Sequence, residues 1–196
     1  IVLPLNKIRH AIQGYTTPRT FHVTNYRRAA EYDIAVVQSW RHYLNLYLGH
    51  DSSLEGRTIL ELGPGADLGV GVILTMLGAR RYNALDVHDL VASVPMELYD
   101  ILFKLIADNH EAVLDVDALR HQLELRRKGL DSKINYICDR KFDLRRFKNE
   151  RIDLVFSQAA FEHFDNIPDT FAQLSEIVVP GGILVAEIDL STHTRW

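Results

Sequence analysis

The sequence of 196 residues contains a single cysteine and little excess of charge of either sign. Because Cys138 has no second cysteine to pair with, no disulfide can form within the chain, which is typical of a reducing compartment. A formal net charge of −4 gives no electrostatic reason to expect nucleic acid as a partner. No apolar run approaches the roughly 20 residues of a membrane-spanning helix, and no signal-peptide pattern opens the sequence. We therefore expect a cytoplasmic protein with no membrane span and no nucleic acid as a partner.

What the sequence does contain is a glycine-rich turn between a strand pattern and a helix pattern. Residues 58–62 form an apolar, β-type run that carries Glu61 near its end, and Gly63, Pro64 and Gly65 follow directly. Apolar residues at helical spacing come next. A strand, a tight turn and a helix in this order deliver a ligand to the carboxyl end of a parallel strand. The glycines let the ligand approach the backbone closely, and the helix directs its free N–H groups toward it.

The charges beside this turn indicate the kind of ligand. A dinucleotide fingerprint requires a third glycine at a fixed spacing, but here that glycine is displaced to Gly69, and Asp67 lies within the turn. A carboxylate in this position would repel a pyrophosphate group, whereas Glu61 suits a ligand that carries an ammonium group. The stretch resembles the first motif of the class I S-adenosylmethionine-dependent methyltransferases. In that family the acidic residue faces the methionine end of the cofactor.

A second strand pattern, over residues 81–87, also ends in an acidic residue. Asp86 follows the glycine turn at close to the spacing of roughly 20 residues expected for the acid that binds a ribose. A carboxylate there can accept hydrogen bonds from both ribose hydroxyls of an adenosine ligand. The alternative is that Asp86 only caps the strand. We take Asp86, with its neighbour Val87, as the candidate for ribose binding.

A third strand pattern covers residues 134–138 and leads into Asp139 and Arg140. In the methyltransferase pattern, an acidic residue at this position hydrogen-bonds the adenine amino group. The resemblance therefore implies that Asp139, with Arg140 beside it, contributes to adenine binding. The alternative is an aspartate that only stabilises a turn.

The fourth strand pattern, residues 151–157, is apolar almost throughout, as expected for a strand covered on both faces. It leads into Ser157 and Gln158 and then into Phe-Glu-His-Phe at 161–164. The region resembles the fourth methyltransferase motif, which implies that Ser157 and Gln158 form the floor of the cofactor pocket. The Glu-His pair resembles that of many small-molecule methyltransferases, and the four-residue stretch also resembles one in the cyclopropane fatty-acid synthases.

The Glu-His pair, Glu162 and His163, is the candidate for catalysis. If the acceptor is a hydroxyl, a base must remove its proton, and histidine titrates near neutral pH. Glu162 would then orient the imidazole or bind a metal. We predict no group of metal-ligating residues in the candidate site. The alternative is that His163 is a hydrogen-bonded residue of the core.

The remaining patterns complete an alternation of strands and helices, which predicts an α/β fold. A fifth strand is expected at 183–188, after a turn formed by Pro180-Gly181-Gly182. We predict a doubly wound, Rossmann-like parallel sheet with strand order 3-2-1-4-5. The sheet of the resembled family has two further strands, an antiparallel hairpin at one edge, and no pattern for them precedes Trp196. We therefore expect either a fragment of a longer protein or an edge that another chain covers.

Helical segments are expected on both sides of the second strand. Residues 1–53 are predicted to form an N-terminal helical cover, and residues 54–196 the S-adenosylmethionine-binding domain. The cover contains a helix at 26–48, and the side chains predicted to form its buried stripe are Ala30, Ile34, Val37, Trp40, Tyr43, Leu44 and Tyr47. A second set of aromatic and histidine side chains is expected to close over the cofactor pocket: Tyr15, Phe21, His22 and Tyr26.

A helical insertion is expected at about 90–132, with one helix after Pro95 and a second capped by Asp115 or Asp117. It forms either a flap over the acceptor pocket or a contact with a second subunit, as in a homodimer, and both alternatives remain open.

The resemblance implies a methyltransferase with S-adenosylmethionine as cofactor. The sequence at the fourth motif lacks the Asn/Asp-Pro-Pro-Tyr/Phe pattern of amino methylation and the Pro-Cys pair of cytosine methylation. We therefore predict transfer to a small molecule, through a hydroxyl of a natural product, sugar or lipid precursor. The alternatives are a nicotinamide-dependent oxidoreductase and a non-catalytic, cofactor-binding subunit of a methyltransferase complex.

Overall fold

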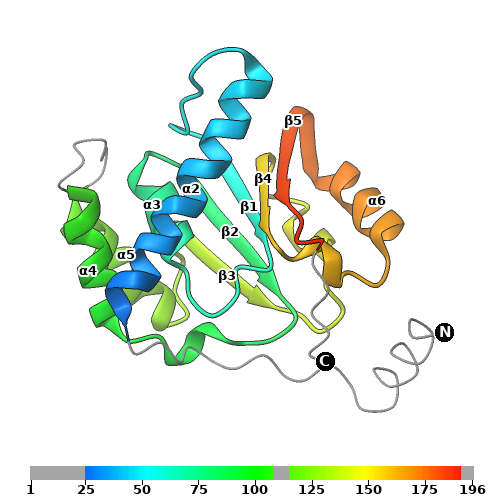
Figure 1. Ribbon diagram of the computed structural model, residues 1–196. Coiled ribbons are helices and arrows are strands. Elements are labelled where there is room, and N and C mark those ends of the chain that lie inside the picture. Colours follow the sequence, from blue (N-terminus) through cyan, green and yellow to red (C-terminus); the bar gives the residue numbers. More distant parts are fainter. Residues whose placement is uncertain (1–24, 108–114, 191–196) are drawn as a thin grey trace, which may run out of the picture.

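The computed structural model describes residues 25–107 and 115–190. Within these residues, five strands form one sheet in the order β3-β2-β1-β4-β5 (Figure 1). The strands are β1 (Thr58–Leu62), β2 (Arg81–Asp86), β3 (Ile134–Cys138), β4 (Ile152–Gln158) and β5 (Val178–Glu187). Each neighbouring pair is parallel, which confirms the predicted doubly wound sheet and its order. The order reverses between β1 and β4, so a crevice opens at the carboxyl ends of these two strands.

Helices cover both faces of the sheet (Figure 1). One face carries α2 (Tyr26–Leu48), α3 (Gly69–Met76), α4 (Met96–Ala107) and α5 (Val116–Arg127), whose buried side chains share one hydrophobic core. The other face carries α6 (Ile167–Ile177) and the short 3-10 helix η2 (Leu144–Phe147), which share a second core. Two further 3-10 helices are η1 (Val91–Ser93) and η3 (Phe161–His163).

The central strand β1 divides its side chains between the two cores, because successive residues of a strand point to opposite faces. Ile59 packs into the core on the α2 face, whereas Leu60 and Leu62 pack into the core on the α6 face. Glu61 follows the same alternation and therefore shares the α2 face with Ile59. All five residues of the strand are buried. This alternation places an acidic side chain beneath the helices that cover the sheet.

The helix α2 begins and ends where the sequence predicts. The side chain of Asn25 accepts a hydrogen bond from the backbone N–H of Arg28, and Gly49 ends the helix with φ at 74°. The predicted buried stripe was wrong in part, because Tyr43 and Tyr47 are 54% and 77% exposed. The stripe that contacts the core instead contains a charged residue, and its members are Ala30, Asp33, Val36, Val37, Trp40 and Leu44.

The inserted helices α4 and α5 pack with α2 and α3 into the same core. Of the two predicted caps for α5, Asp115 is the one observed, because its side chain accepts a hydrogen bond of 2.7 Å from the backbone N–H of Ala118. Across the two described stretches, none of the helices has the length and apolar character needed to cross a membrane.

The glycine pair at 181–182 does not precede the fifth strand, as the sequence suggested, but lies within it. β5 begins at Val178, which pairs with Ile152, and the next pair joins Ile183 to Leu154. The strand therefore holds additional residues at this point, an irregularity that Gly181 accommodates with φ at +83°. The expected turn is a bulge in the strand, because pairing with β4 already begins before the glycines.

Candidate cofactor site

A cavity of about 720 Å³ opens at the carboxyl ends of β1 and β4, at the point where the strand order reverses. Its volume lies within the range of roughly 300–1,000 Å³ that is common for small-molecule sites. Three segments line it: the first turns of α2, the glycine turn after β1, and the residues that follow β4. Of the candidate cofactor-binding residues, the wall contains Glu61, Gly63, Pro64, Gly65 and Gln158.

The glycine turn needs its glycines for two different reasons. Gly63 and Gly65 have φ at +70° and +77°, a conformation that other residues adopt only with strain. A Cβ on Gly63 would also lie 2.8 Å from the Cβ of Ala160, so this position has no room for a side chain. A Cβ on Gly65 would meet no atom within 4 Å. The first glycine lets the turn pack on the residues after β4, and the second leaves its backbone open.

Glu61 is only 2% exposed, and its carboxyl accepts a hydrogen bond of 2.5 Å from the hydroxyl of Tyr82 on β2. Burial raises the pKa of Glu61 to about 8; the hydrogen bond from Tyr82 lowers it, and the charges of Asp67 and Asp86 raise it further. A positive charge in the cavity would stabilise the ionised form of this group. The predicted acidic residue at the end of the strand is therefore in the cavity wall and is suited to a cation.

The structure adds an acidic residue that the sequence analysis missed, Asp33 on α2. Asp33 is 5% exposed and lines the same cavity. A Cβ on Gly69 would lie 2.0 Å from Oδ2 of Asp33 and 3.1 Å from Oδ1 of Asp67, so both carboxyl groups lie against one backbone position. The signal in the sequence was an acidic residue in the apolar stripe of the helix, between Ala30 and Val37.

The carboxyl groups of Asp33 and Asp67 affect each other's ionisation. Burial, followed by the charges of Asp67 and Glu61, raises the pKa of Asp33 to about 9. Burial also raises the pKa of Asp67, although the backbone N–H of Gly69 donates to it at 2.8 Å and lowers that pKa. Oδ2 of Asp33 is buried and receives no hydrogen bond from the described residues. Because its neighbour Asp67 is itself an acceptor, only a proton on one of the two groups can join them.

Asp86 lies against the glycine turn. Its carboxyl accepts hydrogen bonds from the backbone N–H groups of Gly65, at 3.4 Å, and His88, at 3.0 Å. Burial raises the pKa of Asp86, while these backbone hydrogen bonds lower it. Val87, the other candidate beside it, is 36% exposed. The structure thus brings Asp86 to the edge of the turn, and its role toward a ribose stays a prediction.

Asp139 and Arg140 follow β3 and do not line the cavity. The carboxyl of Asp139 accepts hydrogen bonds from the backbone N–H of Lys141, at 2.9 Å, and from Nε of Arg146, at 2.5 Å. These two contacts, the backbone hydrogen bond first, lower the pKa of Asp139. The backbone N–H of Asp139 donates to the carbonyl of Asp86 at 2.8 Å, so the ends of β3 and β2 lie together. Binding of adenine by Asp139 stays a prediction.

Ser157 and Gln158 end β4, and the structure gives them different roles. The hydroxyl of Ser157 is buried and donates to the carbonyl of Leu62 at 3.2 Å, which ties β4 to β1. The side-chain oxygen of Gln158 accepts from Nε1 of Trp40 at 3.0 Å. Trp40 in turn stacks on Phe156, with ring centroids 4.7 Å apart. This contact fixes α2 over the end of β4, so the wall of the cavity formed by α2 is anchored to the sheet.

The candidate catalytic residues Glu162 and His163 lie in η3, close in sequence to the end of β4. Neither residue lines the cavity, and His163 is exposed. Both carboxylate oxygens of Glu162 are buried and receive no hydrogen bond from the described residues. In residues 25–107 and 115–190, no three His, Cys, Asp or Glu side chains are arranged to hold a metal ion. The catalytic role of the pair stays a prediction.

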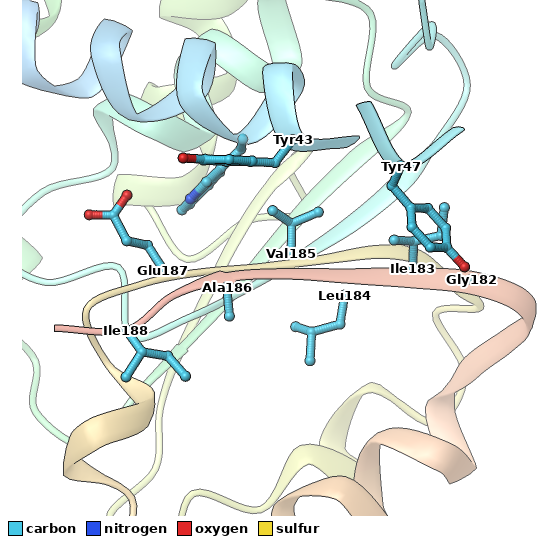
Figure 2. A pocket seen from close by; sticks show the side chains of 10 residues that line it. Tyr43, Tyr47, Gly182, Ile183, Leu184, Val185, Ala186, Glu187 and Ile188 are labelled. Atoms are coloured by element: carbon cyan, nitrogen blue, oxygen red, sulfur yellow. The ribbon is translucent and has the colours of Figure 1, made fainter. Parts of the chain in front are cut away.

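A second cavity, of about 710 Å³, lies between α2 and β5 (Figure 2). Figure 2 shows Ile183 and Val185 on the side of β5 that faces Tyr43, with Leu184 and Ala186 on the other side. Trp40 and Tyr47 complete the wall from α2. The sequence analysis did not predict this groove, because it placed both tyrosines in the core. Tyr15, Phe21 and His22, expected to close over the cofactor pocket, lie outside the described residues.

Comparison with known proteins finds similarity to methyltransferases. The family model of a methyltransferase domain matches residues 99–186. A comparison with curated proteins finds no match. Among solved structures, a candidate methyltransferase of Haloferax volcanii, in complex with the Trm112 methyltransferase activator, is 17% identical with a TM-score of 0.43. The match covers 86% of this chain and 62% of that protein.

Two further structures are similar at the same level. A candidate S-adenosyl-L-methionine-dependent methyltransferase of Methanococcus maripaludis is 14% identical with a TM-score of 0.41, over 86% of this chain and 66% of that one. A methyltransferase of Thiobacillus denitrificans in complex with S-adenosyl-L-homocysteine is 15% identical with a TM-score of 0.42, over 76% and 47%. This chain spans less than two thirds of the length of each of these three proteins. Similarity this low carries no argument about function.

The sheet order and the crevice at its reversal point define a Rossmann-like domain. The match of a methyltransferase family model to residues 99–186, which begins after the glycine turn, agrees with the resemblance to class I S-adenosylmethionine-dependent methyltransferases that the sequence motifs indicate.

Proposed function

We propose that this protein transfers the methyl group of S-adenosylmethionine to a hydroxyl of a small-molecule acceptor, a natural product, sugar or lipid precursor. The observation that carries the proposal is the set of carboxyl groups around the glycine turn, from Asp33 and Glu61, which are buried, and from Asp67, which is partly buried. S-adenosylmethionine bears a sulfonium and an ammonium group, and buried carboxyl groups with raised pKa values favour such cationic ligands. The same groups disfavour the pyrophosphate of a nicotinamide cofactor.

Different residues of this chain would contact different parts of the cofactor. Glu61 and the open backbone of Gly65 suit the methionine end, because both line the cavity at the start of α3. Asp86 would hold the ribose hydroxyls and Asp139 the adenine amino group, in line with the order of the strand ends. Bound S-adenosylmethionine supplies an electrophilic methyl group to a nucleophile held in line with it. The task of the protein is therefore mainly to position the acceptor.

For a hydroxyl acceptor, His163 is the candidate base and Glu162 the group that orients it. We further propose that residues 1–53 act as a cover and residues 54–196 as the cofactor-binding domain, in a cytoplasmic protein. Support for the cover comes from α2, which contributes both Arg28 and Asp33 to the cavity wall.

The test of the proposal is a calorimetric titration of the chain with S-adenosylhomocysteine and, separately, with NAD. We expect S-adenosylhomocysteine (the homocysteine form of the cofactor) to bind. The Asp86→Ala substitution should weaken this binding about tenfold or more, since the two hydrogen bonds from the ribose hydroxyls to the carboxylate are lost. Asp131→Ala is the matched control, because Asp131 is 87% exposed and pairs only with Arg81 in the part of the chain described. Binding of NAD without binding of the homocysteine form would contradict the proposal.

A further inference from the structure

Asp33 and Asp67 form a carboxyl pair that bridges α2 and the glycine turn. Asp33 lines the cavity and is only 5% exposed, and its Oδ2 receives no hydrogen bond from the described residues. Both carboxyl groups lie against the backbone of Gly69, where a Cβ would lie 2.0 Å from Oδ2 of Asp33 and 3.1 Å from Oδ1 of Asp67. Asp33 is buried and Asp67 partly buried, so ionisation of both carboxyl groups without a compensating cation is strongly unfavourable.

The surroundings of the pair contain few groups that could supply that compensation. The other titratable groups near it are Arg28 and Tyr32 on α2, Glu61 on β1, Tyr82 and Asp86 on β2, and Tyr99 on α4. Of these only Arg28 is cationic, and it is exposed. The hydroxyl of Tyr99 accepts from the backbone N–H of Leu68 at 3.3 Å and gives the pair no positive charge. Among residues 25–107 and 115–190, a proton is therefore the remaining means of neutralising the pair in the free protein.

We propose that Asp33 is a residue that selects the sulfonium cofactor. In the free protein Asp33 and Asp67 share one proton, and the pair gives that proton to solvent when the positively charged cofactor enters the cavity. The proposal rests on the proposed function, because the cation is S-adenosylmethionine.

The selectivity follows from the charges of the two forms of the cofactor. S-adenosylmethionine carries one positive charge more than S-adenosylhomocysteine, whose sulfur is neutral. S-adenosylmethionine stabilises the ionised state of both carboxyl groups of the pair, whereas with S-adenosylhomocysteine a larger fraction of the pair stays protonated. The pair therefore strengthens binding of the methyl donor relative to the demethylated product, and it favours release of that product. Burial and the charge of Asp67 raise the pKa of Asp33, which favours the protonated form of the pair before the cofactor binds.

The test is calorimetric titration of the full chain near neutral pH, with S-adenosylmethionine and with S-adenosylhomocysteine, in two buffers of different ionisation enthalpy. The difference between buffers counts the protons released on binding. Because both ligands carry the ammonium group, Glu61 loses its proton with either of them, and we expect the unmodified protein to release about one proton more with the sulfonium form than with the homocysteine form. For Asp33→Asn we expect this difference in proton release to disappear and the preference for the sulfonium form to fall about tenfold.

Control variants separate the pair from other groups. Asp33→Asn should fold, because asparagine has the shape of the protonated aspartic acid; if it does not, Asp67→Asn tests the same pair. Glu31→Gln on the same helix is the matched control, since Glu31 is 53% exposed and pairs with Arg27, and it should change nothing. Glu61 is another buried acid whose proton is released with either ligand, so the difference in proton release between the two ligands is the quantity that reports on the pair. A difference that persists in both aspartate variants would overturn the inference.

The outcomes also separate this inference from the proposed function. If both ligands bind but Asp33→Asn leaves the proton release and the preference unchanged, the role of Asp33 is wrong and the methyltransferase proposal stands. If neither ligand binds the unmodified protein, both are overturned.

Discussion

Replacing Gly63 by alanine is expected to lower the free energy of unfolding by about 2–4 kcal/mol and to abolish binding of the cofactor. The left-handed conformation at φ +70° costs a residue with a side chain roughly 1–2 kcal/mol. The new Cβ would in addition lie 2.8 Å from Cβ of Ala160, so the turn and the residues after β4 must move apart. Because Ala159, beside that residue, lines the cavity, the shift also deforms the site. Urea unfolding and calorimetric titration with S-adenosylhomocysteine measure the two effects.

Gly49→Ala is the matched control for this variant. Gly49 has φ at +74°, ends α2, and a Cβ there would meet nothing within 4 Å. It should therefore show the conformational cost alone, roughly 1–2 kcal/mol, with cofactor binding unchanged. Equal losses of stability in the two variants, with binding intact in both, would show that the close approach of Gly63 to Ala160 has no role in the site.

Replacing Glu61 by glutamine is expected to weaken binding of S-adenosylmethionine about 100-fold. Glutamine retains an oxygen that accepts a hydrogen bond from Tyr82, so the packing of the strand is preserved. Unlike the carboxyl group of Glu61, however, glutamine cannot ionise when a cationic ligand binds, so the charge–charge attraction is lost. Glu55→Gln, an exposed position before β1, should leave binding unchanged. Calorimetric titration measures the change. A Glu61→Gln protein with the affinity of the unmodified protein would exclude Glu61 from the site.

The same variant has a second readout in the pH dependence of stability. The pKa of Glu61 is about 8 in the folded protein and roughly 4.3 in the unfolded chain, so between these values the folded form holds a proton that the unfolded form has lost. Stability of the unmodified protein therefore decreases as pH rises through this window, by at most about 1.4 kcal/mol per pH unit from this group. Glu61→Gln removes that contribution, so the variant should gain stability relative to the unmodified protein between about pH 5 and pH 8.

The order of the strands could be predicted because strand patterns alternate with helical patterns along the sequence. A parallel sheet with crossover helices has few allowed topologies, and the glycine turn after β1 marks where the order reverses. The bulge in β5 could not be predicted in the same way. Proline and two glycines in sequence signal a turn, but only the pairing of Val178 with Ile152 shows that the strand begins before them.

Site residues that lie at the ends of strands could be predicted from the sequence, whereas those that tertiary packing brings to the site could not. Glu61, Gly63 and Gly65 come from one contiguous motif and line the cavity. Asp33 lies 28 residues before Glu61 by the numbering, in a helix whose stripe was assumed to be apolar, so no local pattern joined it to the turn. Asp139 matched its motif position, but its hydrogen bond from Arg146 depends on the path of the following loop.

The central claim is that S-adenosylmethionine binds between α2 and the glycine turn. Hydrogen exchange of the full chain, with and without S-adenosylhomocysteine, tests this claim most directly, because a second cavity of similar volume lies between α2 and β5. We predict slower exchange in residues 63–69 and in the first turns of α2, around Asp33, with no change in β5. Protection confined to β5 and the region of Tyr43 and Tyr47 would place the ligand in the other cavity and contradict the account.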